Sequence, residues 1–208
     1  MTRILRIDSS ARPVSGGSRS RELADRIVGQ LETQQPGAEI ITRDLAARPL
    51  PHIANDTITG FYTPPEQLTD ELTAALALSD QLIAELKSAD TVVISAPIYN
   101  FSIPSALKAW IDHVMRITQT FAFEDGQFRG LVADRPVYVA YAYGAGGYAS
   151  GGPLESYDYM RPYLTLLLNF MGVTSVESFA VEGTTADAAA VEASMAEALN
   201  QINVHLGG

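Results

Sequence analysis

The fold of this chain is decided by a ten-residue stretch that reads Ser95-Ala96-Pro97-Ile98-Tyr99-Asn100-Phe101-Ser102-Ile103-Pro104. The β-branched and apolar run 91–94 before it is typical of a buried strand, and residues 105–111 after it predict a helix. The stretch is therefore a strand-to-helix loop, where ligands bind in open α/β sheets. Its backbone N–H groups, the Asn100 amide and two flanking aromatic rings suit a flat heteroaromatic ligand with polar edges. The alternative is a turn whose rings only cover the core.

Length, composition and charge narrow the class of protein. The 208 residues suit one α/β domain spanning 1–208, and 47% hydrophobic residues can form a sizeable core. Acidic residues outnumber basic ones 24 to 14, and the net charge of −10 argues against binding to nucleic acid or an anionic membrane. Without cysteine there are no disulfides, thiolate metal sites or thiol catalysis. No apolar run reaches the length of a membrane span, so we expect a cytoplasmic protein.

Strand and helix patterns alternate along the chain. Strands are predicted at 3–8, 39–44, 91–94, 136–142 and 173–181, each followed by a segment with helical spacing of its apolar residues. Two segments depart from this order: a proline-rich excursion at 45–65, with at most short helical pieces, and a small hairpin at 120–128. The order predicts a doubly wound parallel sheet of five strands, arranged 2-1-3-4-5, with helices on both faces.

Three unusual loops leave the carboxyl ends of strands one, three and four, at 9–20, 97–104 and 143–152. In the order 2-1-3-4-5 these ends meet at one crevice beside the topological switch point. The first loop carries Ser10, Ser18 and Ser20, and such hydroxyls at a helix N-terminus suit a phosphate, to which Arg19 could add charge. It has neither a Walker A sequence nor a dinucleotide fingerprint. The alternative is an ordinary serine N-cap.

The third loop is rich in glycine, and the histidines are scattered. Gly144, Gly146 and Gly147 would let the backbone approach a ligand closely, although a plain flexible linker has the same composition. Because His52, His113 and His205 lack ligand spacing, we expect no metal site. His113 follows Asp112 on a predicted helix, and no nucleophile motif accompanies it, so we interpret it as structural.

Taken together, these residues resemble the FMN-dependent NADH-azoreductases of bacteria, relatives of the flavodoxin-like NAD(P)H:quinone oxidoreductases. The resemblance covers nearly the whole chain. It is carried by segments that recur in order at Arg43-Asp44-Leu45-Ala46, Leu76–Lys87, Ala96–Lys108, Thr120-Phe121 with Gly130-Leu131, Arg161-Pro162-Tyr163-Leu164 with Phe170-Met171-Gly172, and Ala180-Val181-Glu182-Gly183.

The resemblance implies a flavodoxin-like fold and a site for FMN. By it, Ser10 and the run Ser18-Arg19-Ser20 hold the phosphate, and Pro97 with Ile98-Tyr99-Asn100-Phe101 wraps the isoalloxazine. Ile98 stands where the family has methionine. The family's Ser-Arg-Gly-Gly after strand four is replaced here by Tyr143-Gly144-Ala145-Gly146-Gly147. By the resemblance, Tyr143, Gly144, Gly146 and Gly147 are expected to contact the cofactor. Phe123 and Phe170 are expected on the substrate side of the flavin.

The resemblance also implies an activity. NADH or NADPH would give a hydride to FMN and leave, and an azo compound or quinone would then take its place. Two other classes remain open: a flavodoxin-type electron carrier without small-molecule turnover, and a phosphate-binding module without redox activity. A homodimer is expected as well, with apolar surface of the 105–117 helix, which carries Trp110, Ile111 and Met115, as a candidate subunit contact.

Overall fold

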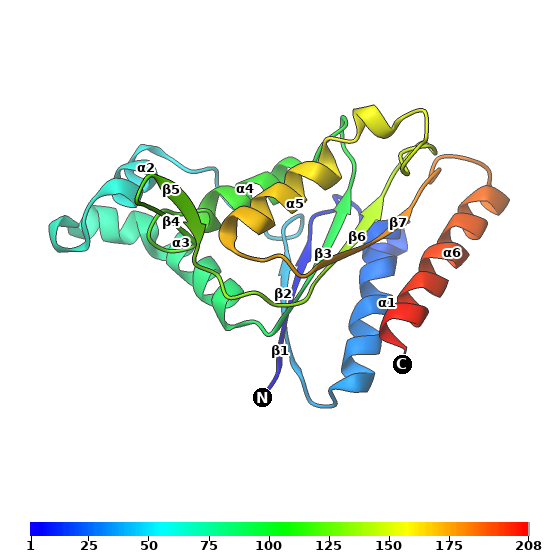
Figure 1. The fold of residues 1–208 in the computed structure, drawn as a ribbon, viewed down its shortest axis with the longest axis horizontal. Coiled ribbons are helices and arrows are strands. Elements are labelled where there is room, and N and C mark those ends of the chain that lie inside the picture. Colours follow the sequence, from blue (N-terminus) through cyan, green and yellow to red (C-terminus); the bar gives the residue numbers. More distant parts are fainter. Residues whose placement is uncertain (208) are drawn as a thin grey trace.

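The computed structural model describes residues 1–207 and contains the expected central sheet (Figure 1). Five parallel strands lie in the order β2-β1-β3-β6-β7. They span Arg3–Asp8 (β1), Glu39–Asp44 (β2), Thr91–Pro97 (β3), Val137–Ala142 (β6) and Val176–Val181 (β7). Numbered within this sheet alone, the order is 2-1-3-4-5, so the predicted topology is confirmed. β3 and β6 are buried along their whole length, as strands covered on both faces must be.

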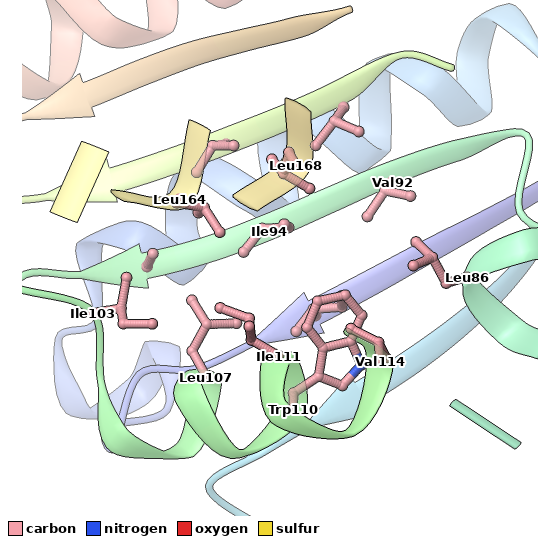
Figure 2. Packing of buried hydrophobic residues seen from close by; sticks show 14 of the residues in the cluster. Leu86, Val92, Ile94, Ile103, Leu107, Trp110, Ile111, Val114, Leu164 and Leu168 are labelled. Atoms are coloured by element: carbon pink, nitrogen blue, oxygen red, sulfur yellow. The ribbon is translucent and has the colours of Figure 1, made fainter. Parts of the chain in front are cut away.

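Helices cover both faces of the sheet. The helices α1 (Arg19–Gln34) and α6 (Ala188–Leu206) lie side by side on one face, where Leu23 and Ile27 pack with Ile202 over Val93 (Figure 1). The other face carries α3 (Asp70–Ser88), α4 (Ser105–Val114) and α5 (Met160–Met171). Figure 2 shows Leu107 and Leu164 converging on Ile94 from two of these helices.

The helix α4 is more deeply buried than expected. Trp110 and Ile111 point into the core (Figure 2) and are only 1% and 2% exposed. Met115 is partly buried against the same core. The outward positions of α4 hold polar residues such as Lys108 and Asp112. The expectation of a subunit contact is therefore wrong for Trp110 and Ile111, because the core already covers their side chains. Met115, just past the end of α4, is only partly buried.

Two irregular segments lie beside the sheet. The excursion at 45–65 contains the short helix α2 (Asn55–Tyr62), and the predicted hairpin consists of β4 (Phe121–Glu124) and β5 (Gln127–Gly130), paired antiparallel. His113 is buried, and its Nε2 lies 2.9 Å from the Pro51 carbonyl oxygen, so it fastens the excursion to α4. Among residues 1–207, no helix is long and apolar enough to cross a membrane.

Candidate functional site

The three loops meet at the carboxyl edge of the sheet, and between them lies a cavity of about 380 Å³. Eight of the predicted site residues line it, and they come from all three loops: Ser10, Ser18, Arg19, Ser20, Pro97, Ile98, Tyr99 and Gly144. Arg12 and Arg19 also place two cations on its wall, whereas no Asp or Glu of the described chain lines it. In a chain of net charge −10, such a cavity favours an anion.

The first loop leaves hydrogen-bond donors unused at the start of α1. Ser18 occupies the N-cap position, yet its side chain makes no capping hydrogen bond. The amides of the first helical turn, at 19–21, therefore have no partner within the helix and are available to an anion. The hydroxyls of Ser18 and Ser20 lie 3.5 Å apart, and both residues are buried. The sequence alternative of an ordinary serine cap does not describe this geometry.

The second loop forms a tight, strained turn. Tyr99 and Ser102 exchange backbone hydrogen bonds of 2.9 and 3.1 Å, and both residues between them have positive φ, 48° at Asn100 and 70° at Phe101. Two central residues of this kind are typical of a type I′ turn, which Asn tolerates but Phe rarely enters. Strained backbone of this kind concentrates at ligand sites. The Tyr99 hydroxyl accepts a 3.2 Å hydrogen bond from the Ala11 amide, which joins this turn to the first loop.

A second and larger cavity, of about 790 Å³, lies on the other side of this turn. Its wall is mainly apolar and aromatic, with a few polar groups: Tyr99, Asn100, Ser102, Ile103, Ser105, Lys108, Tyr159, Pro162, Tyr163 and Leu166. Tyr99 lines both cavities, so the two are neighbours separated by one side chain. Concave, mainly apolar cavities with a few polar groups are typical small-molecule sites.

The third loop contributes less to the cavities than the sequence suggests. Tyr143 is fully buried; its hydroxyl donates to Asp158 Oδ2 at 2.8 Å, and burial raises the pKa of its phenol. The amides of Gly147 and Tyr148 donate to the Glu182 carboxylate at 2.6 and 3.2 Å, so they are already paired. Of the predicted residues here, only Gly144 lines the smaller cavity; Tyr143, Gly146 and Gly147 line neither.

Three predicted aromatic residues lie outside both linings. Phe101 is 49% exposed and contacts Tyr157 at a ring distance of 5.6 Å. Phe123 is 54% exposed on β4, and its ring lies 4.9 Å from that of Phe128. Phe128 in turn lies 5.1 Å from Phe170 on α5, so hairpin and helix share one aromatic cluster.

Sequence reasoning missed part of the cavity wall. Thr184 and Thr185 line it from the loop between β7 and α6, and Arg12 lines it from the first loop. The signal was available, because β7 is parallel to β6 and its carboxyl end must reach the same edge. A pair of threonines is a weak pattern beside serine-rich and glycine-rich loops, so the sequence does not single it out.

The sequence of this chain matches one protein family and, within it, several enzymes of known name. The family described as having a flavodoxin-like fold matches residues 2–206, and the chain belongs to this family. The FMN-dependent NADH:quinone oxidoreductase of Xanthobacter autotrophicus is 52% identical over 177 residues, covering 85% of this chain and 84% of that protein. The protein of the same name from Herminiimonas arsenicoxydans is 42% identical over 98% of both chains.

Solved structures agree with this placement. The azoreductase from Bacillus anthracis superimposes with a TM-score of 0.89 at 25% identity, and the match covers 99% of both chains. The resemblance found in the sequence is thereby confirmed in family and in fold.

Proposed function

We propose that this chain is an oxidoreductase that binds FMN at the junction of its three loops, takes hydride from NADH and reduces quinones. The observation that carries the proposal is the pair of cavities that share Tyr99, one lined by cations and hydroxyls and the other by aromatic rings. The names of the relatives supply the cofactor, the donor and the acceptor class. The order 2-1-3-4-5 supports a flavin at this edge, because its switch point lies between β1 and β3.

The residues of the smaller cavity fit the phosphate of FMN. The unpaired first-turn amides of α1 and the hydroxyls of Ser18 and Ser20 would donate to it, and Arg12 and Arg19 would balance its charge. Asn100 and the backbone of the 99–102 turn would orient the ring system. The flavin supplies the hydride chemistry once bound, and the protein supplies binding and orientation. This division explains why no acid–base pair is required.

The larger cavity suits the donor and the acceptor in turn. A single aromatic-lined space next to the turn favours a ping-pong order, in which the nicotinamide leaves before a quinone enters. An azo compound fits the same space, and its cleavage takes two rounds of reduction. The azoreductase named among the similar structures supports this second acceptor class. The names of the relatives favour NADH over NADPH as the donor.

The same surface supports a homodimer, but not through α4. Large apolar side chains are exposed on the 99–102 turn, the hairpin and α5, with Phe101 49%, Phe123 54%, Phe128 60% and Leu166 61% accessible. Exposed apolar patches of this kind mark interaction sites. A second copy seated here would close the larger cavity and exclude water from it. Phe123 and Phe170 then belong to the wall on the substrate side.

One purification tests the proposal against its rival, an electron carrier of the flavodoxin type. The visible spectrum and chromatography of the released flavin should show FMN, not FAD. Anaerobic titration with NADH and then NADPH should bleach the flavin, and steady-state NADH oxidation should depend on added quinone. A colourless protein, or a flavoprotein that oxidises NADH poorly with quinone present, would contradict the enzyme. The larger cavity favours the enzyme, since a carrier needs no space for a small molecule.

A further inference from the structure

Arg21 is a buried cation behind the lining of the smaller cavity, where it contacts the backbone of Ser10. It lies in the first turn of α1 and is 6% exposed. Its two terminal nitrogens donate to the Asp44 carboxylate at 2.6 and 2.8 Å, and one of them also donates to the Ser10 carbonyl oxygen at 2.8 Å. Arg21 does not line the cavity itself. Of its contacts, only the one with the Ser10 carbonyl oxygen reaches the backbone that does.

The contact with Ser10 fixes one peptide group. In a trans peptide the C=O and N–H point in opposite directions. The carbonyl oxygen of the Ser10–Ala11 peptide accepts from Arg21, and its N–H donates to the Tyr99 hydroxyl at 3.2 Å. The peptide is therefore held from both sides. If it rotated, the carbonyl dipole could turn toward the cavity, where it would repel an anion.

Arg21 is itself held by a fixed frame of carboxylates. Asp44 accepts 3.0 Å hydrogen bonds from the amides of Ala46 and Ala47, and the Arg21 guanidinium keeps the pKa of this carboxyl well below its usual range. Asp8, 3.6 Å from Arg21, accepts from the Ser95 hydroxyl at 2.8 Å. Buried ion pairs add little net stability compared with apolar residues of similar volume. The Arg21–Asp44 pair is therefore better explained by the geometry that it imposes on the first loop than by a gain in stability.

We propose that Arg21 is a positioning residue for the phosphate of the flavin: it fixes the Ser10–Ala11 peptide, so that the first loop meets the phosphate with donors and not with a carbonyl oxygen. This rests on the proposed function. Tyr99 lines both cavities, so the same clamp connects the phosphate end with the turn that borders the aromatic cavity. A preformed loop saves the ordering that binding would otherwise require.

The test compares Arg21→Met with Arg43→Met in the full-length protein freed of flavin. Arg43 forms a similar bidentate pair with Glu85, but it does not line or support the cavity. FMN and riboflavin, which lacks the phosphate, are titrated by fluorescence. Arg21→Met should weaken FMN binding by about tenfold to a hundredfold, the range of a charged hydrogen bond, and change riboflavin binding much less. Arg43→Met should leave the ratio of the two affinities unchanged.

Two further arms keep the proposal falsifiable. In Arg21→Met the Asp44 carboxylate loses its cationic partner, and the double variant Arg21→Met/Asp44→Asn removes that unpaired charge as well. If the double variant regains FMN binding, Arg21 acts only by neutralising Asp44, and the proposal is wrong. Thermal protection by inorganic phosphate alone should be present in the wild type and in Arg43→Met and lost in Arg21→Met. Parallel weakening of FMN and riboflavin would show a merely structural role. A wild type that binds no FMN would instead contradict the proposed function.

Discussion

The proposed phosphate end of the site (Ser10, Ser18 and Ser20) and the aromatic face beside it (the hairpin and α5) reverse the usual distribution of residues. At the phosphate end, Ser10, Ser18 and Ser20 are hydroxyl residues no more than 6% exposed. On the aromatic face, Phe128 and Leu166 are large apolar residues about 60% exposed. Polar groups are normally exposed and apolar groups buried. The first region therefore has buried polar groups that need a partner, and the second has exposed apolar groups that need a cover. The first suits a small anion, and the second an apolar partner.

The two regions also differ in how they are held. The first loop is fixed by a charge-assisted hydrogen bond of 2.8 Å from Arg21 to the Ser10 carbonyl oxygen, whereas the aromatic face is held by ring contacts of 4.9 to 5.1 Å. Hydrogen bonds to charged groups are directional, and ring packing tolerates rearrangement. We infer that the phosphate end determines whether the cofactor binds and that the aromatic face determines what else can approach it.

The strongest way to break the comparison is to remove the hydroxyls of the phosphate end. Ser18→Ala/Ser20→Ala should weaken FMN binding by well over tenfold, because each hydrogen bond to the phosphate contributes about 1.5–3 kcal/mol. Flavin fluorescence titration measures the affinity. Ser15→Ala is the matched control, since Ser15 is exposed on the same loop and does not line the cavity. Equal affinities in the double variant and the control would place the phosphate elsewhere.

The next largest effect is expected on the aromatic face. Leu166→Glu puts a charge in the middle of the proposed subunit contact, and desolvating that charge should oppose association. Light scattering at micromolar concentration should change from a dimer toward the 22.4 kDa chain, and quinone reductase activity should fall on dilution. Val204→Glu is the control, because Val204 is 78% exposed on α6 over the opposite face of the sheet. A fully active monomeric wild type would refute the dimer.

The position of the site, at the edge where the carboxyl ends of the strands meet, was predictable from the sequence. Runs of apolar residues fix the strands, and parallel order alone brings the ends of β1, β3 and β6 together. Side-chain pairing was not predictable in the same way. The Glu182 carboxylate takes the amides that a glycine-rich loop seemed to offer, and it lies 35 positions along the chain from Gly147.

Burial of single residues was harder still to predict. Tyr143 looked like a cofactor contact because it begins a loop at the right edge, yet its ring stacks on Tyr148 at 4.7 Å inside the core. Arg21 looked like an ordinary helix residue, and nothing in the local pattern shows that Asp44 and Ser10 converge on it. Such contacts depend on the distance between elements, which periodicity does not encode.

A smaller effect is expected at Asn100, where the two regions meet. Asn100→Asp is the better test substitution than a bulky residue, because φ at Asn100 is 48° and Asp tolerates this conformation. The carboxylate cannot donate as the amide does, and its charge disfavours the electron-rich reduced flavin. FMN retention on gel filtration and the midpoint potential should both decrease. Asn169→Asp on α5 makes the same change in net charge at an exposed site. If both variants kept the wild-type potential, Asn100 would not face the flavin.

The smallest effect concerns acid, and here it is tested on the Arg21–Asp44 pair. Arg21 depresses the pKa of Asp44 in the folded protein below its unfolded value of about 3.9. A depressed pKa means that folding favours the ionised form, so this contribution is complete above about pH 5 and disappears as the pH falls toward the folded pKa.

Asp44→Asn should therefore lower the free energy of unfolding by a constant amount, about 1–2 kcal/mol, between pH 5 and pH 8. The difference from the wild type should shrink below about pH 4, as the wild-type carboxylate becomes protonated. Urea unfolding at several pH values measures it. A difference between Asp44→Asn and the wild type that stayed constant down to pH 3 would show that the Arg21–Asp44 pair does not hold the first loop through its charge.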